Sequence, residues 1–138
     1  MDKPLKILVK LPSRGRPEKF FKALDSIVDN IQDKENTFIS CTLDTDDETY
    51  NNEAFISRVR TRQAKISIEW GLSKSKIHAV NRSIPDIEWD VICIGSDDIF
   101  FNFYGFDSVI RAEMNGHFPN GDGYLHFHEK DRDRKSVV

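Results

Sequence analysis

The sequence predicts a single α/β domain built on a mostly parallel β-sheet of about five strands with helices on both faces. Three observations support this prediction. Short apolar or alternating segments recur along the 138-residue chain, amphipathic helical patterns separate them, and Gly or Pro punctuates the junctions. Strands that alternate with helices in this way are joined by right-handed crossovers, which place neighbouring strands parallel. We expect one unit over 1–138, with a charged, frayed tail at 130–138.

The first expected strand and helix form the clearest pair. The segment "LKILVKLP" (5–12) is apolar and ends at Pro12. In the following loop, Gly15 can adopt a positive φ. Pro17 suits the first turn of a helix, where its missing N–H costs nothing. Apolar side chains then recur at helical spacing over 17–31.

The middle of the chain repeats this pattern. The segment 37–43 alternates as a strand and leads into the acidic cluster "DTDDE" (44–48). A more polar helix is expected over 49–60, and 65–70 alternates again as a third strand. A loop and a third helix then occupy 71–84, before Pro85.

The last part of the chain supplies two more expected strands. The segment "DVICI" (90–94) reads as a buried strand, and 123–128 alternates as a fifth. Between them a helix is expected from about Phe106, with Gly116 as its C-cap.

Composition excludes several classes of protein. A net charge of −3 argues against a general nucleic-acid-binding protein, which usually has a basic face. No stretch approaches the roughly 20 apolar residues of a membrane span, and the N-terminal residues lack the long apolar stretch of a signal peptide. The two cysteines, Cys41 and Cys93, lie in expected strands, which favours reduced core thiols. We therefore expect a cytoplasmic protein; composition leaves the oligomeric state open.

Polar clusters follow three of the expected strands. They are 13–16 after the first strand, 44–47 after the second, and Asp97 with Asp98 after the fourth. In open α/β sheets, ligands bind beyond the carboxyl ends of the strands. The sequence therefore predicts that the three clusters converge on one site.

Two readings are open for the adjacent carboxylates Asp97 and Asp98. They suit Mg²⁺ or Mn²⁺, which prefers carboxylate oxygens and takes further ligands from water and phosphate. The alternative is a turn in which Ser96 or Asp97 caps the next segment. His126 and His128 share one face of the last expected strand, so either could add a nitrogen ligand; surface histidines are the alternative.

The other clusters also allow two readings each. Asp44 could accept a hydrogen bond from a ribose or base, while acids up to Glu48 could cap the following helix. Arg14 and Arg16 could bind an anion, or lie in a solvated loop. Lys76 could reach polar ligand atoms or be solvated. The loop is not a Walker loop, and the chain contains no GxGxxG motif.

The ordered set of motifs resembles the family 2 type glycosyltransferases of the Rossmann-like GT-A fold. The segment 12–17 ("PSRGRP") is similar to the "P-[ST]-x-x-R-P" loop of that family. The acid that ends the second strand, the stretch 71–84 and the acids after the fourth strand come in the same order. The sequence departs from the family at Gly95, where many relatives have an acid, and at Ser83, which replaces a glycine.

The resemblance implies a nucleotide-diphosphate sugar donor, Mg²⁺ or Mn²⁺, and an unidentified hydroxyl acceptor. It makes Asp98 the direct metal ligand, with Asp97 beside it on ribose or phosphate. Its donor-binding residues would be Pro12, Ser13, Arg14, Arg16, Asp44, Lys76 and Asp97. Relatives carry the catalytic base in a later, acceptor-binding half; the late candidates for this role in the chain are Asp122, Glu129 and Asp131.

Two other functions are consistent with the same residues. One is a non-catalytic or truncated domain that binds a nucleotide sugar and needs a partner for the acceptor. The other is a nucleotidyltransferase, although the loop 13–16 has a single glycine, where those enzymes need a Gly-rich loop.

Overall fold

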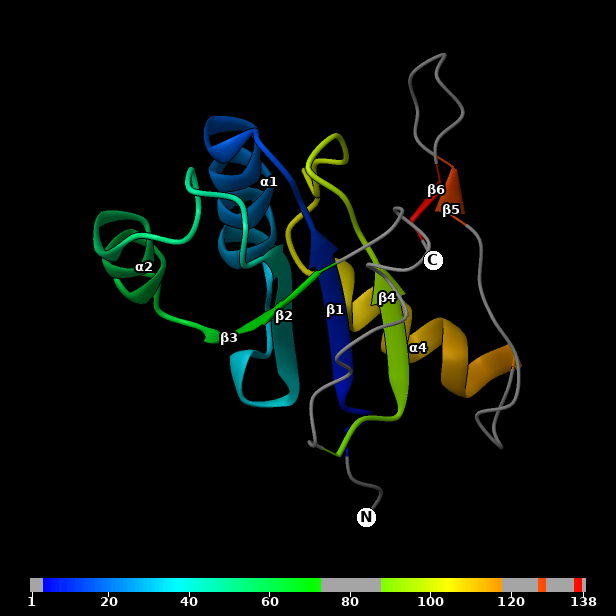
Figure 1. Cartoon of the computed structure of the whole chain (residues 1–138). Helices are drawn as coiled ribbons and strands as arrows, with labels where there is room; N and C mark the ends of the chain where they lie inside the picture. Colours follow the sequence, from blue (N-terminus) through cyan, green and yellow to red (C-terminus); the bar gives the residue numbers. More distant parts are fainter. Residues whose placement is uncertain (1–3, 73–87, 118–126, 129–135, 138) are drawn as a thin grey trace.

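The protein has a four-stranded parallel sheet in the order β3-β2-β1-β4 (Figure 1). The computed structural model describes residues 4–72, 88–117, 127–128 and 136–137. The strands of the sheet are β1 (Ile7–Pro12), β2 (Thr37–Asp44), β3 (Lys65–Gly71) and β4 (Val91–Ile94). The helices are α1 (Pro17–Asn30), the short 3₁₀ helix η1 (Lys34–Asn36), α2 (Glu53–Arg60) and α4 (Phe106–His117). The predicted α/β class and parallel sheet are confirmed.

Of the expected fifth strand over 123–128, the structure describes the last two residues, and these do not belong to this sheet. β5 (Phe127–His128) instead pairs antiparallel with β6 (Ser136–Val137) in a separate two-stranded sheet. The sheet therefore has four strands, slightly fewer than the expected five or so, because an alternating pattern identifies a strand without identifying its neighbour. The stretch expected to fray includes β6. The helix expected over 71–84 lies almost wholly in 73–87, outside the described residues.

Helix α2 begins later than the sequence suggested. Its N-cap is Asn52, whose side chain accepts a hydrogen bond from the backbone N–H of Phe55 at 2.8 Å. The expectation that acids up to Glu48 cap this helix was therefore wrong. Asparagine is as good an N-cap as aspartate, and it stands directly before the apolar helical pattern.

The start of α1 was predicted correctly from the sequence, but the end of α4 was not. Pro17 is at the start of α1, and Gly15 adopts φ 65°, as expected. Gly116, in contrast, lies inside α4 rather than capping it, and it has no positive φ. The expectation of a C-cap there was wrong.

The core lies between one face of the sheet and the three described helices. Alternate residues of β1 (Ile7, Val9 and Leu11) join apolar side chains from all three helices in a single buried cluster. Leu8 and Lys10 point to the opposite face and are also fully buried. Cys41 and Cys93 are free, buried thiols, and burial raises the pKa of each to about 12. None of the described helices is long and apolar enough to cross a membrane.

A buried carboxylate fixes α4 to the end of α1. Asp107 is fully buried and accepts hydrogen bonds from the backbone N–H groups of Gln32 and Asp33 at 2.8 and 2.9 Å. It also contacts the guanidinium of Arg111, one helical turn later, and the hydroxyl of Thr37 at 3.5 Å. Burial alone would raise the pKa of Asp107, but the two backbone donors and Arg111 outweigh it and lower the pKa below the usual value.

Arg111 in turn ties α4 to the start of the sheet. Its guanidinium donates to the carbonyl oxygens of Leu5 and Asn36, both at 2.7 Å, and to the hydroxyl of Thr37. The Asp107–Arg111 pair is therefore satisfied on both sides, which a buried ion pair needs in order to be tolerated.

Stability should decrease in acid partly through Asp107. Because its pKa is lower in the folded state, its contribution is complete above the unfolded carboxyl pKa and is lost as pH falls through the folded pKa. We expect the free energy of unfolding of the wild type to exceed that of Asp107→Asn at neutral pH, and the gap to narrow below about pH 4. Urea denaturation across pH measures this gap. Glu88→Gln changes an exposed carboxylate, so its free energy of unfolding at neutral pH should be close to that of the wild type. A gap for Asp107→Asn that stays constant with pH would contradict the assignment.

The segment that follows β4 runs along α1. The backbone N–H of Phe101 donates to the hydroxyl of Ser26 at 3.0 Å, and its carbonyl accepts from the side chain of Asn30. The N–H of Gly105 then donates to the carbonyl of Asn30 at 2.7 Å. The segment from 97 to 105 is therefore held against the helix before α4 begins.

Candidate functional site

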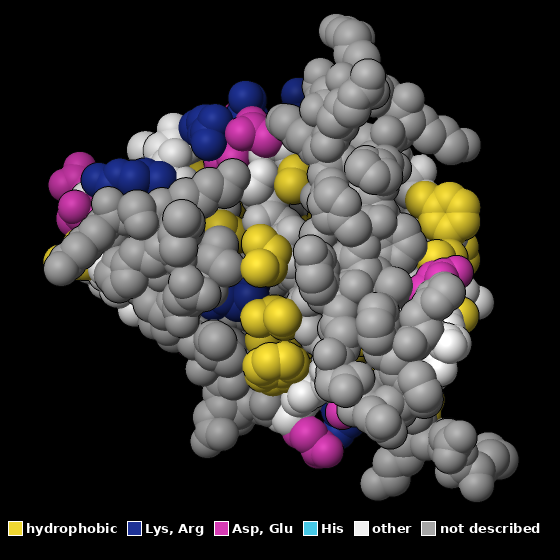
Figure 2. Space-filling model, turned by 90° about the vertical axis from the view of Figure 1, so that its right-hand side faces the viewer, with side chains coloured by type: hydrophobic (Ala, Val, Ile, Leu, Met, Phe, Trp, Pro, Cys, Tyr) yellow, Lys and Arg dark blue, Asp and Glu magenta, His cyan; other side chains and the backbone are white. Residues whose placement is uncertain are grey.

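The three polar clusters meet at the carboxyl edge of the sheet. Contacts join 13–16 to 44–47 on one side and to Asp97 and Asp98 on the other. Pro12 ends β1 directly beneath them. Figure 2 shows acidic and basic side chains against one another at the top of the molecule, the end at which the strands of Figure 1 terminate. The predicted convergence of the clusters is confirmed.

Cationic side chains from the loop after β1 and from α1 form ion pairs with the acid pair, Asp97 and Asp98. Arg16 contacts Asp97 at 3.0 Å and Asp98 at 3.6 Å, and Lys19 contacts Asp98 at 3.3 Å. Asp97 is 2% exposed, whereas the side chain of Asp98 is 35% exposed. The chain itself therefore supplies the counter-charge that two adjacent carboxylates at the end of an apolar strand need.

The acid pair also forms part of a turn. The backbone N–H of Asp98 donates to the hydroxyl of Ser96 at 3.2 Å, and the N–H of Ile99 donates to the carbonyl of Ser96 at 3.1 Å. Capping of the turn by Ser96, one of the two readings of this motif, is therefore present. It leaves the partly exposed carboxylate of Asp98 at the surface.

A short hydrogen-bonded chain holds Asp97 in place. The Ser13 hydroxyl donates to Asp97 at 2.7 Å, which uses its one proton. The contact between Ser13 and Tyr50 must then be donated by the Tyr50 hydroxyl, which also accepts from the N–H of Arg16 at 3.1 Å. Burial raises the pKa of Tyr50, so this hydroxyl keeps its proton at neutral pH.

Arg14 connects the first loop to the acids after β2. Its guanidinium contacts Asp44 at 2.5 Å and Asp46 at 2.9 Å. Hydrogen bonds to Asp46 and Asp44 hold the pKa of Arg14 above its usual value. Asp44 is buried and Asp46 is exposed. Arg14 therefore contacts one carboxylate that is shielded from solvent and one that faces solvent.

Asp47 shapes the two loops rather than facing a ligand. It accepts from the N–H of Gly15 at 2.7 Å and from the N–H and hydroxyl of Thr49. The loops after β1 and β2 are thereby joined through backbone groups.

Sequence reasoning missed Tyr50, Lys19 and the structural role of Asp47. Lys19 stands three residues after Arg16, so the helical spacing of the two cations could have identified it. Tyr50 had no such signal, because its polar neighbours gave no indication that its ring is fully buried.

Several predicted site residues lie outside the described residues. These are Lys76, Asp122, His126, Glu129 and Asp131. The backbone of His128 lies in β5. Within the described part of the chain, no group of three or more His, Cys, Asp or Glu side chains is arranged to hold a metal ion. Asp97 and Asp98 therefore provide two carboxylates, and further ligands would have to come from water or from a bound phosphate.

The sheet order β3-β2-β1-β4 and the polar loops at its carboxyl edge are those of a Rossmann-like α/β fold. Among solved structures, the chain is similar to S. aureus TarS (residues 1–349), a staphylococcal glycosyltransferase. The TM-score is 0.61 at 14% sequence identity, and the match covers 92% of this chain. The match spans 40% of the TarS chain, less than half of its length. At this identity the likeness concerns the fold.

No family model matches the sequence, and no curated protein matches it significantly.

Proposed function

We propose that this domain binds a nucleotide-diphosphate sugar through a divalent cation and transfers the sugar to a hydroxyl acceptor. The observation that carries the proposal is the position of Asp98. It is a partly exposed carboxylate at the carboxyl edge of a glycosyltransferase-like sheet, next to polar loops from two other strands. In sheets of this kind the ligand lies beyond that edge.

The residues present fit a hard cation. Asp98 would hold Mg²⁺ or Mn²⁺, and the more deeply buried Asp97, fixed by Ser13 and Arg16, would contact ribose or phosphate. A bound cation would stabilise the negative charge that develops on the departing nucleoside diphosphate. Asp44 and the loop 12–16 would border the nucleoside.

Arg16 and Lys19 acquire a role in this proposal. Arg16 contacts Asp97 and Asp98, and Lys19 contacts Asp98. When a cation binds Asp98, the two side chains would turn to the diphosphate oxygens, which guanidinium and ammonium groups bind well. Donor binding would then replace the ion pairs that Arg16 and Lys19 make with the acid pair by ion pairs with the diphosphate.

A non-catalytic donor-binding domain is the second candidate. The contacts of Asp97 and Asp98 support donor binding in both candidates. The two candidates differ in turnover: an enzyme releases free nucleoside diphosphate from the donor when an acceptor is supplied, and a binding domain does not.

Thermal unfolding with and without Mn²⁺ tests the donor site, using UDP-, GDP-, CDP- and ADP-linked ligands. A ligand at about 100 times its dissociation constant adds about 2.7 kcal/mol of stability. We expect a metal-dependent rise in the melting temperature of several degrees with one nucleotide. Asp98→Ala should abolish the rise.

The matched control is Glu88→Ala. Glu88 is also an exposed acid in an ion pair, with Lys6 at 3.2 Å before β1, at the other end of the sheet. This variant should keep the full ligand-dependent rise. If no nucleotide stabilises the wild type, or if Asp98→Ala responds as strongly as the wild type, the proposed donor site is wrong.

A further inference from the structure

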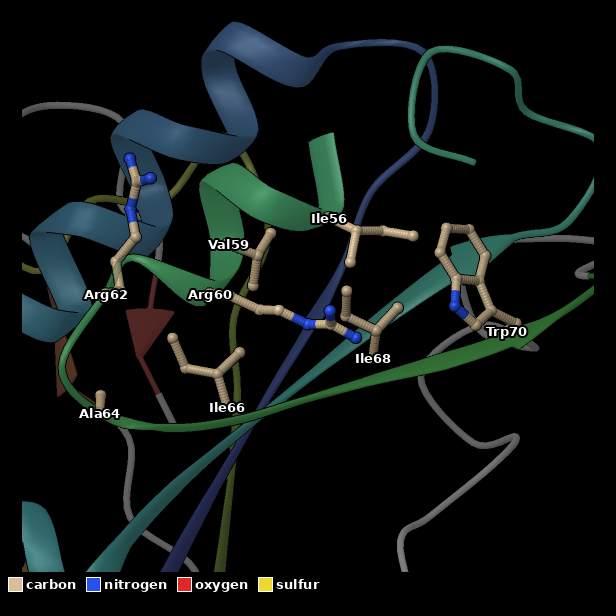
Figure 3. Close-up of a pocket in the computed structure, with 8 residues that line it drawn as sticks. All are labelled: Ile56, Val59, Arg60, Arg62, Ala64, Ile66, Ile68 and Trp70. Atoms are coloured by element: carbon tan, nitrogen blue, oxygen red, sulfur yellow. The ribbon is translucent and has the colours of Figure 1, made fainter. Parts of the chain in front are cut away.

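The outer edge of β3 has no neighbour in the described part of the chain. β3 is the last strand of the sheet and pairs only with β2 there. Beside it, between β3 and α2, lies a cavity of about 420 Å³ (Figure 3). The cavity is lined by Ile56, Val59, Arg60, Arg62, Ala64, Ile66, Ile68 and Trp70. An open strand edge is a surface that another strand can extend, and here it lies beside a groove lined by apolar side chains and two arginines.

The backbone of β3 shows which residues could pair outward. The carbonyl of Gly71 accepts from the N–H of Thr45, just beyond β2, so it points toward β2. Backbone groups alternate sides along a strand. Ile66, Ile68 and Trp70 therefore direct their N–H and C=O groups outward, and their side chains face the groove.

We propose that the β3 edge pairs with the β3 edge of a second copy of this chain, antiparallel, about a two-fold axis at Ser67. This register places Lys65 opposite Glu69 of the second copy, and Ile66 opposite Ile68. Each of these contacts occurs twice, because the axis repeats it. The two sheets become one continuous eight-stranded sheet.

The charges of the strand select this register. Pairing Lys65 with its own copy, or Glu69 with its own copy, would set like charges directly opposite, which is destabilising. Pairing about Ser67 replaces both repulsions with ion pairs. Lys65 is exposed, and its acidic contact in the described residues is the exposed Glu35 at 3.3 Å, so it can reach a second carboxylate.

The groove fits the same arrangement. Ala64 and Trp70 lie at opposite ends of the cavity (Figure 3). In the proposed register, Trp70 of each copy stands opposite Ala64 of the other. The largest side chain of the strand therefore meets the smallest residue of the groove lining.

Charge exchange tests the pairing. At about 1 mM protein the wild type should sediment at about twice the chain mass of 16.0 kDa. Glu69→Lys and Lys65→Glu should each be monomeric alone, with an unchanged circular dichroism spectrum. Mixing the two variants should restore the dimer, because every facing pair is then of opposite charge. A monomeric wild type, or a Glu69→Lys variant that stays dimeric, overturns the proposal.

A cross-link tests the register. The two Ser67 residues form a non-hydrogen-bonded pair with Cα atoms about 4.5 Å apart, within the range of a disulfide. Ser67→Cys should form a covalent dimer on oxidation. Lys65→Cys, whose two copies lie about 13 Å apart, should not. Equal cross-linking of the two variants overturns the register.

Discussion

Replacement of Arg111 by methionine should lower the free energy of unfolding by about 3–5 kcal/mol, the cost of removing one partner of a buried ion pair. Methionine fills much of the same volume but leaves Asp107 as an uncompensated buried charge. It also removes the donors to the carbonyls of Leu5 and Asn36. Equilibrium urea denaturation at neutral pH measures the loss.

The matched control is Arg58→Met. Arg58 also pairs with an acid, Glu18, at 3.2 Å, but both side chains are exposed. Exposed pairs contribute little, so this variant should lose about 1 kcal/mol or less. A loss for Arg111→Met no larger than that of Arg58→Met would mean that the Asp107 contacts do not hold α4.

Replacement of Phe20 by alanine should cost about 3–5 kcal/mol, the range for a fully buried phenylalanine. Phe20 is fully buried. The centroid of its ring lies 5.7 Å from the ring centroid of Tyr50 and 5.3 Å from that of Phe55. It therefore joins α1 to the loop that carries Tyr50 and to α2. Since Tyr50 holds Ser13 and Arg16, the variant should also weaken donor binding in the thermal assay.

Phe103→Ala is the control for the same change at the surface. Phe103 is 62% exposed, and surface substitutions are usually within about 0.5 kcal/mol of the wild type. Chemical denaturation compares the two variants directly. If the two variants lost the same free energy of unfolding, the packing of Phe20 against its aromatic neighbours would not contribute the stability expected here.

The sequence was most informative where periodicity and turn chemistry agree. Pro17 and the apolar spacing over 17–31 predicted α1 to within one residue of its observed end. The sheet followed from the alternation of strands and helices. The convergence of the polar clusters could then be predicted because the carboxyl ends of parallel strands lie at one edge.

Features that depend on tertiary partners could not be predicted in this way. Lys10 stands in an otherwise apolar strand, yet it is fully buried and donates to the hydroxyl of Thr42 at 2.8 Å. No local pattern indicates that contact, because Thr42 belongs to β2. The partner of β5 was hidden for the same reason: two-residue strands carry too little pattern to specify pairing.

The contacts between the 97–105 segment and α1 determine how far a displacement of Asp98 is transmitted along the chain. Lys19 holds Asp98 near the start of α1, and Ser26 and Asn30 hold Phe101 further along the same helix. A displacement of Asp98 would therefore be absorbed by the few residues before Phe101. Helix α1, about 21 Å long, therefore separates the contact of Asp98 near its start from the contact of Gly105, directly before α4, at its end.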